Sequence, residues 1–490
     1  MNVLLVYPPN PESFWSFSHV LKFVAKKSAF PPLGLLTVAA MLPSTWNLRL
    51  VDINVSPLTD DDVLWADYVF LSGMIVHKAS AHTIAQRCAA RGRPVVAGGP
   101  LFSTGFSEFP EIPHFVVGEA EGVVTQLVSD MQRGALEPVY RAAGFPDLWG
   151  TPVPRWDLID LRHYVSMPVQ FSRGCPFECE FCDIIVMNGR LPRTKSPEQV
   201  VRELEALRRA GWDEMVFLVD DNFIGHRRHA KELLQALIAW RRRAPTSMQF
   251  LTEASINLAD SPELVELMVA AGFKQVFVGI ESPSSESLLE CGKVQNRKRD
   301  LGEALSTLQR AGLEVMGGFI VGFDSDPHDI FLRQFDFIQR NGVVTAMVGL
   351  LTALPHTALY RRLAGEGRIL RETGGNNTDA ILNFVPRLDR EFLIGGYRDL
   401  MQRLYSPKAY HLRVRVFLRR FTPQGPATAL SRSDTKAFLK SLWMLGIQDT
   451  GRLEYWYLFL STLLSSPRKL PTAVKLAILG YHFRRVAAAI

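Results

Sequence analysis

The chain is poor in cysteine and has no apolar run long enough to cross a bilayer. Its 490 residues include five cysteines, three of them clustered, which is too few for a secreted disulfide scaffold and fits a reducing cytoplasm. The N-terminus lacks the basic segment and small-residue cleavage site of a secretory signal, and no internal repeat is present. We therefore expect a cytoplasmic protein of two or three domains.

An excess of charge of one sign is also missing. Lysine and arginine number 55 against 49 aspartates and glutamates, so charge alone does not indicate a nucleic-acid partner. A G-x-G-x-x-G motif is absent, which argues against a nicotinamide dinucleotide. With 47% hydrophobic residues the chain can fill sizeable cores, so we expect a globular protein. From the charge balance we expect no nucleic-acid ligand.

One short loop carries the strongest chemical signal. Cys175, Cys179 and Cys182 have C-x3-C-x2-C spacing and follow a strand-like run at 167–172. Three thiolates on such a loop can hold three irons of a cubane cluster and leave the fourth iron without a protein ligand. An open metal position is where a substrate or cosubstrate binds.

Zinc and a disulfide are the competing interpretations of this loop. Structural zinc takes four ligands, commonly from paired cysteine knuckles, and the remaining cysteines, Cys88 and Cys291, are isolated and distant in the sequence. A disulfide would leave one of the three clustered cysteines unpaired. The spacing therefore favours an iron–sulfur cluster.

The region before the loop, residues 1–135, alternates apolar strands with helical patterns and predicts a doubly wound parallel sheet. The expected strands are 3–7, 48–52, 68–73, 95–100 and 115–119, with helices near 33–42 and 79–90. Ligands of such sheets bind at the carboxyl ends of the strands, and glycines there let a ligand approach the backbone. The candidate residues at these ends are Ser72, Gly73, Gly98, Gly99, Gly118 and Glu119.

After a linker rich in glycine and proline at 136–166, strand and helix signals alternate through 167–365 and predict a partial (β/α)6 barrel. The expected strands are 167–172, 215–220, 249–252, 275–280, 315–321 and 346–351. Chemistry in such barrels lies at the carboxyl ends of the strands. Residues 366–490 predict a C-terminal, mostly helical domain, which completes an α/β protein of three parts.

The cysteine loop resembles the signature of the radical S-adenosylmethionine (radical SAM) superfamily, in which an aromatic residue such as Phe181 precedes the last cysteine. The resemblance implies a [4Fe-4S] cluster on the three cysteines and SAM on the open iron. It also implies SAM contacts at strand ends, although Asp220-Asp221-Asn222 replaces the Gly-Gly-Glu-like element of the family. The implied SAM-binding residues are Phe181, Asp221, Asn222, Glu253, Ser255, Gly279, Glu281 and Gly318.

The N-terminal sheet resembles the cobalamin-binding domain that precedes the barrel in one class of this superfamily. That resemblance implies that the six candidate residues of the first sheet bind cobalamin. The Asp-x-His-x-x-Gly element by which other cobalamin proteins place a histidine on cobalt is absent. The resemblance implies a lower cobalt face without a protein ligand. We expect His77 to be an ordinary loop histidine rather than a cobalt ligand.

The implied reaction is methylation of an unactivated carbon, which consumes two SAM molecules and needs an external electron donor of the flavodoxin or ferredoxin type. Segments 14–17, 21–27 and 30–37 look like the subgroup that contains hopanoid C-2 methylases, which implies a lipid or other small-molecule substrate. Methylation of a peptide or protein side chain or of a tetrapyrrole remains open. So do an N-terminal interaction domain that binds no cobalamin and a non-catalytic iron–sulfur carrier.

Two further segments have alternative interpretations. The basic stretch 293–299 is expected to be a solvated surface loop, with contact to an anionic cosubstrate as the alternative. The aromatic run 453–464 is too short to span a bilayer, and we expect it to pack within its domain. Its alternative is an amphipathic element in peripheral contact with the inner membrane.

Overall fold

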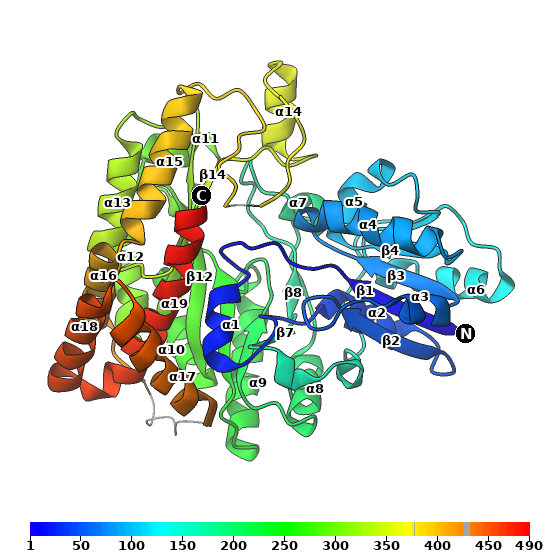
Figure 1. Ribbon diagram of the computed structural model, residues 1–490, viewed down its shortest axis with the longest axis horizontal. Helices are drawn as coiled ribbons and strands as arrows, with labels where there is room; N and C mark the ends of the chain where they lie inside the picture. The colour runs from blue at the N-terminus through cyan, green and yellow to red at the C-terminus, as the bar shows by residue number, and fades with distance from the viewer. Residues whose placement is uncertain (377, 425–431) are drawn as a thin grey trace.

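The computed structural model describes residues 1–376, 378–424 and 432–490 and confirms the predicted α/β fold (Figure 1). It contains a six-stranded parallel sheet, a second six-stranded parallel sheet and a layer of C-terminal helices. None of the described helices is both long and apolar enough to cross a membrane.

The first sheet has the order β2-β1-β3-β4-β5-β6, and all its strand pairs are parallel. Its strands are β1 (Asn2–Tyr7), β2 (Asn47–Asp52), β3 (Tyr68–Ser72), β4 (Val95–Gly98), β5 (His114–Val117) and β6 (Val139–Arg141). Separate apolar cores cover its two faces, as expected for a doubly wound sheet. One core takes up α2 (Leu33–Met41) and α6 (Val124–Arg133); the other takes up α3 (Asp60–Trp65), α4 (Lys78–Ala89) and α5 (Pro100–Gly105).

Strand β6 corrects the expected extent of this region. The predicted boundary at 135 is too early, because β6 pairs with β5 within the range assigned to the linker. Three residues are too few to show a periodic pattern, and Pro138 directly before them reads as a turn signal. The sheet therefore runs to Arg141.

The second sheet has the order β14-β13-β12-β11-β10-β7, and its neighbouring strands are all parallel. Its strands are β7 (Met167–Val169), β10 (Met215–Leu218), β11 (Gln249–Ala254), β12 (Phe273–Glu281), β13 (Glu314–Val321) and β14 (Ala346–Leu350). Strands β7 and β14 stand at opposite edges, so the barrel is partial, as predicted. Its helices are α8 (Pro197–Arg209), α9 (Arg227–Arg243), α10 (Pro262–Ala271), α11 (Ser285–Glu290), α12 (Leu301–Arg310), α13 (Ile330–Arg340) and α14 (Ala358–Gly365).

The first barrel helix shows why these elements could be located from the sequence. Ser196 caps α8: its side chain accepts the Gln199 N–H, while Gln199 bonds back to the Ser196 N–H. Pro197 occupies the first helical turn, where no N–H is needed. This capping box fixes the start of the helix.

The C-terminal helices share one continuous apolar core with the barrel. They are α15 (Arg390–Leu404), α16 (Pro407–Arg420), α17 (Arg432–Trp443), α18 (Arg452–Ser465) and α19 (Leu470–Ala489). The short helix α1 (Ser18–Val24) lies beside α19 and α17 (Figure 1). Phe14, just before it, stacks on Phe483 with ring centroids 4.3 Å apart. A segment near the N-terminus is thus built into the C-terminal layer.

Candidate functional site

The cysteine loop leaves the carboxyl end of β7 through the short strand β8 (Ser172–Arg173), which pairs with β9 (Arg193–Thr194). Gly174, with φ +96°, makes the turn into the loop. A Cβ at Gly174 would lie 2.9 Å from the Gly189 carbonyl and 3.0 Å from that of Asn188, so only glycine fits. The Cys175 N–H then donates to the Gly189 carbonyl at 3.2 Å, which ties the first cysteine to the loop after α7 (Ile184–Met187).

All three predicted ligands are free thiols. Burial raises the pKa of Cys175, Cys179 and Cys182 in the metal-free chain, which opposes thiolate formation until a cation is bound. Within the described residues, no three histidine, cysteine or carboxylate side chains converge to hold a single metal ion. A cubane cluster takes each thiolate at a different iron and needs no such convergence, so the donor set fits a cluster better than zinc.

Cys291 lies closer to this loop than its sequence position indicates. Its carbonyl accepts the Glu180 N–H at 2.9 Å, whereas its thiol lies 3.8 Å from the Leu288 carbonyl in α11. Cys291 is distant from the cluster loop in the sequence, but the loop after α11 folds back and brings its backbone against the cysteines. Its thiol nevertheless faces its own helix.

The end of β10 anchors the cysteine loop. Buried Asp220 accepts the Phe171 N–H and the Ser172 hydroxyl, each at 2.8 Å, and burial raises the pKa of Asp220 to about 7. Asp221 accepts the Gly174 N–H at 2.8 Å. Two carboxylates therefore hold the backbone directly before the first cysteine.

Asn222 links this strand end to the next. Its amide N–H2 points at the Cys175 sulfur at 3.9 Å, and its carbonyl oxygen accepts the Ser255 N–H at 3.1 Å. Glu253, on β11, is of intermediate exposure, and burial together with the charges of Asp221 and Asp220 raises the pKa of Glu253 to about 8. The structure thus brings Asp221, Asn222, Glu253 and Ser255 together; their contact with SAM stays a prediction.

The end of β12 and the loop after α11 bring a buried ion pair to the cysteines. Glu281, with φ +64°, bonds the Lys293 ammonium at 2.6 Å, and both side chains are about nine-tenths buried. Burial opposes the charge of Lys293, but Glu281 and Cys179 outweigh it and raise the pKa of Lys293. A Cβ at Gly279 would lie 2.7 Å from the Lys293 nitrogen, so this glycine makes room for the pair. A Cβ at Gly318 would likewise meet the Phe277 ring at 2.9 Å.

The stretch 293–299 departs from the expected solvated loop at its first residues, whereas Lys298 is exposed as expected. Lys293, Gln295 and Asn296 are all buried. The Gln295 amide lies 3.8 Å from the Cys179 sulfur, and Asn296 donates to the Ile280 carbonyl at 2.9 Å. The lysine in this stretch suggested solvent because the sequence does not show that Glu281 neutralises it.

Phe181 lies beside the cysteines and packs near Phe323, with ring centroids 6.2 Å apart. Like the other implied SAM contacts, it lies at the carboxyl end of the partial barrel. Its role toward SAM also stays a prediction.

The six residues predicted at the first sheet gather at the carboxyl ends of β3, β4 and β5. At two of these positions neighbouring side chains leave little room for anything but glycine, whether or not a ligand binds. A Cβ at Gly99 would lie 2.4 Å from the Ser72 hydroxyl, and one at Gly73 would lie 3.2 Å from the His77 side chain. Gly98 meets only ordinary contacts, and Gly118, with φ +89°, accepts no side chain without strain. This edge is compatible with a nucleotide-like ligand close to the backbone.

Glu119, just after β5, connects the first sheet to the β8–β9 pair. Its carboxylate pairs with Arg173 and Arg193, each at 2.5 Å, and Arg173 also pairs with Glu121 at 2.8 Å. All four side chains are largely buried. Both oxygens of Glu119 are thus engaged by the segment that carries the cysteines, and the pairing holds the carboxyl edge of the first sheet against the cysteine loop.

His77 has a structural role, as expected. Its Nδ1 accepts the Met74 N–H at 3.1 Å, so Nε2 carries the proton and donates to the Asn10 side-chain oxygen at 2.8 Å. The residue is fully buried, and burial lowers the pKa of His77 to about 4. Neither ring nitrogen is available to a metal.

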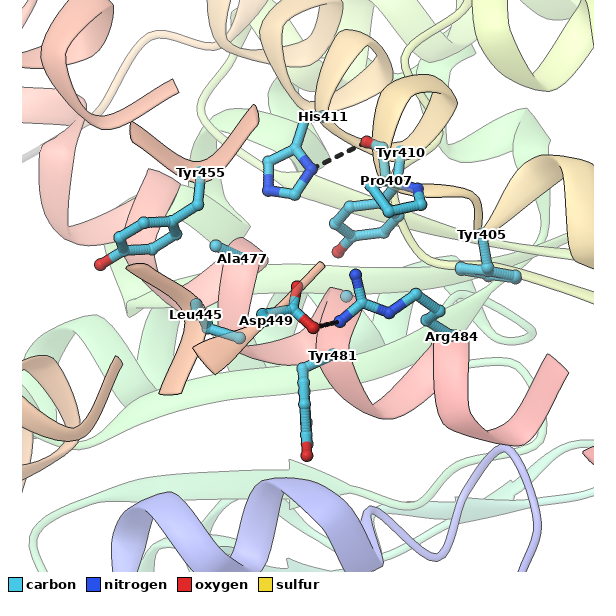
Figure 2. A pocket seen from close by; sticks show the side chains of 11 residues that line it. Tyr405, Pro407, Tyr410, His411, Leu445, Asp449, Tyr455, Ala477, Tyr481 and Arg484 are labelled. Atoms are coloured by element: carbon cyan, nitrogen blue, oxygen red, sulfur yellow. Dashed lines mark hydrogen bonds and ion pairs between the residues drawn. The ribbon is translucent and has the colours of Figure 1, made fainter. Parts of the chain in front are cut away.

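Figure 2 shows a cavity among the C-terminal helices, away from the cysteines. Its volume is about 10 Å³, room for one water at most, and it is lined by side chains such as Tyr410, His411 and Arg484. The His411 Nδ1–H donates to the Pro407 carbonyl at 2.8 Å, and Arg484 pairs with Asp449. The cavity is too small for a substrate.

Comparisons with known proteins agree with this geometry. Residues 169–338 match the Radical SAM superfamily, and residues 357–490 match a domain of unknown function, DUF4070. The chain is 39% identical to an uncharacterized methyltransferase of Synechocystis sp., covering 99% of this chain and 91% of that protein. It is 34% identical to the hopanoid C-2 methylase of Rhodopseudomonas palustris, covering 93% of this chain and 88% of that protein.

Solved structures share the fold. The cobalamin-dependent radical SAM enzyme OxsB superposes with a TM-score of 0.66 at 16% identity, covering 100% of this chain and 80% of that one. The radical SAM methyltransferase TsrM from Kitasatospora setae gives 0.63 at 16% identity, covering 99% of both. Taken with the three-cysteine loop at the mouth of a partial barrel, these matches show that the chain belongs to the radical SAM methyltransferase family, enzymes that use a [4Fe-4S] cluster and S-adenosylmethionine.

Proposed function

We propose that the protein is a cobalamin-dependent methyltransferase that adds a methyl group to an unactivated ring carbon of a hopanoid, C-2 of ring A, or of a similar apolar lipid. The observation that carries the cobalamin part is the Glu119–Arg173–Arg193 junction. It sets the carboxyl edge of the doubly wound sheet against the cysteine loop, so ligands of the two sheets would face one reaction space.

The substrate assignment is supported by the length of the match to the hopanoid C-2 methylase, which includes the C-terminal helices. The bacteriochlorophyllide d C-12(1)-methyltransferase of Chlorobaculum tepidum, in contrast, is 26% identical over 68% of this chain. A tetrapyrrole substrate is therefore the second candidate. Methylation of a peptide side chain is a third and less supported candidate.

The cofactors together would supply a carbon-centred radical and a transferable methyl group, chemistry that acid–base groups cannot reach at an unactivated C–H bond. The chain's own residues do the positioning. Cys175, Cys179 and Cys182 would hold the cluster, and Asp220 and Asp221 fix the backbone before them. Asn222 and Gln295 direct amide N–H groups at two of the sulfurs, contacts that favour the thiolate form. An external donor of the flavodoxin or ferredoxin type would supply electrons.

The test is anaerobic reconstitution with iron, sulfide and hydroxocobalamin, followed by reaction with methyl-labelled SAM, dithionite and a detergent-solubilised hopanoid. We expect release of 5′-deoxyadenosine and transfer of one labelled methyl group to the hopanoid, measured by mass spectrometry. Cys179→Ala should lose the cluster absorption and both products, whereas Cys88→Ala, which changes a cysteine in the core of the first sheet, should keep them.

Each alternative gives a distinct outcome. Deoxyadenosine release without corrinoid uptake would favour an N-terminal interaction domain, and an intact cluster without any SAM cleavage would favour a carrier. Methylation of a tetrapyrrole in place of the hopanoid would show that the substrate proposal is wrong, while the proposal of a methyltransferase would stand.

A further inference from the structure

Helix α18 is apolar on both of its sides, although only one side is buried. Tyr455, Leu458 and Thr462 face the neighbouring helices. The opposite side carries large apolar residues at intervals of four, three and four, which is one stripe of a helix. Their exposed fractions are 76% for Leu453, 56% for Tyr457, 49% for Leu460 and 85% for Leu464.

A stripe of this kind differs from scattered apolar surface residues. Single exposed leucines are ordinary, whereas contiguous exposed apolar side chains mark an interaction surface. Leu463, at 41% exposure, widens the stripe at its C-terminal end. The described segments of the chain cover these side chains only in part, and α18 lies on the side of the molecule away from the first sheet (Figure 1).

The surroundings of the stripe are strongly basic. The Arg415 guanidinium of α16 lies 4.5 Å over the Tyr457 ring, and Arg419, Arg452 and Arg468 are exposed on α16 and at the two ends of α18. Residues 407–490 contain 14 lysines and arginines and three aspartates and glutamates, whereas the whole chain has 55 and 49. The positive charge of the protein is therefore concentrated in the C-terminal helices that carry the stripe.

We propose that this face, defined by the exposed stripe of α18 and the arginines beside it, docks the protein on an anionic phospholipid bilayer. Apolar side chains would enter the boundary between headgroups and acyl chains while arginines pair with anionic headgroups, the arrangement of interfacial amphipathic helices. Tyr457 with Arg415 above its ring combines both contacts. At 14 residues, α18 is suited to lie in the interface.

Charge decides among the occupants of the face. A second copy of the chain would bring two arginine-rich surfaces together, and their repulsion disfavours a dimer. A nucleic acid would leave the leucines unpaired, because its bases stack on aromatic rings and its phosphates bind cations. An anionic bilayer complements both the charge and the apolar stripe. Because this partner is bound whichever molecule is methylated, the proposal goes beyond the proposed function and does not depend on it.

The experiment is flotation of the reconstituted full-length protein with vesicles of pure phosphatidylcholine or of phosphatidylcholine with phosphatidylglycerol. We expect binding to the anionic vesicles at least tenfold tighter than to the neutral ones, weakening as salt is raised. Leu460→Gln/Leu464→Gln should reduce binding to anionic vesicles at least tenfold, and Arg415→Gln/Arg419→Gln should weaken the salt dependence.

The matched control is Leu64→Gln/Leu332→Gln, which changes two leucines of about 50% exposure on α3 and α13 and should bind like the wild type. Thermal unfolding checks that every variant is folded. Equal binding of the α18 variant and the wild type, or no vesicle binding at all, would overturn the proposal. A concentration-dependent dimer that Leu464→Gln dissociates would also overturn it, in favour of a second copy. Loss of hopanoid methylation with vesicle binding intact bears only on the proposed function.

Discussion

At the scale of single residues, the buried ion pair next to the cysteines is the feature with the largest electrostatic consequence. Lys293 is the cation paired with Glu281, and its charge also influences Cys179 and Cys182. A fixed positive charge beside a cluster favours the reduced, more negative state. Gln295 and Asn296 hold the same loop in place.

Replacing Lys293 by methionine should therefore shift the cluster potential to a more negative value. It should also lower the free energy of unfolding by about 3–5 kcal/mol, because Glu281 is left buried and unpaired. The potential is measured by a titration of the reconstituted cluster followed by electron paramagnetic resonance. Lys293→Arg should keep both the cluster potential and the free energy of unfolding close to the wild-type values. Lys298→Met, at an exposed position of the same loop, should change neither quantity. A potential unchanged in Lys293→Met would refute the electrostatic role.

His77 gives a pH dependence whose sign follows from its burial. Its pKa is about 4 in the fold against a usual value of 6.5, so the unfolded chain binds more protons between these two values. Neutral His77 contributes to the free energy of unfolding in full above pH 6.5. This contribution falls as the pH drops toward 4, by up to about 3 kcal/mol. Chemical denaturation of the wild type and His77→Gln at several pH values should show their difference in unfolding free energy shrinking over that range. A constant difference would contradict it.

At the scale of elements, the junction between the first sheet and the β8–β9 pair fixes the geometry of the site. Two arginines on neighbouring short strands share one carboxylate, Glu119, and Arg173 stands directly before Gly174 and the first cysteine. The ion pairs thereby tie the carboxyl end of β5 to the start of the cysteine loop.

Glu119→Gln should leave two largely buried arginines without their shared carboxylate and lower stability by about 3–5 kcal/mol. The effect should be local, with faster hydrogen exchange at the backbone of the cysteine loop than in the wild type. Asp61→Asn, which removes an exposed carboxylate on α3 of the same region, provides the comparison and should leave exchange in this loop unchanged. Unaltered protection of the loop in Glu119→Gln would show that the junction does not hold it.

The same elements show what the sequence can and cannot reveal. Most strands of the second sheet could be predicted because they are short runs rich in apolar residues followed by clear helix signals, as at Ser196. The run expected at 167–172 divides into β7 and β8, which belong to separate sheets. The cysteine spacing identified the chemistry because it is a local pattern. Strand β6 was missed because it is short, and the burial of Lys293 was missed because its partner Glu281 lies 12 residues away and across a turn.

At the scale of the whole molecule, the distribution of apolar cores divides the protein differently from the order of its chain. The first sheet has two cores of its own, whereas the barrel, the C-terminal helices and Phe14 belong to one continuous core. No periodicity could have revealed that residues 14–24 pack against helix α19, since this contact joins opposite ends of the sequence.

Phe14→Ala tests this division. Phe14 is 1% exposed, stacks on Phe483, and its carbonyl lies 3.1 Å from the His482 Nε2. Its truncation should cost about 3–5 kcal/mol, because a buried aromatic ring leaves a cavity. The loss should appear as weaker hydrogen-exchange protection of the barrel and the C-terminal helices, with the first sheet unchanged. Phe102→Ala, within the core of the first sheet, should give the reverse pattern. If Phe14→Ala instead weakened the first sheet, the N-terminal segment would belong energetically to the sheet that follows it in sequence, and the shared core would not act as one cooperative unit.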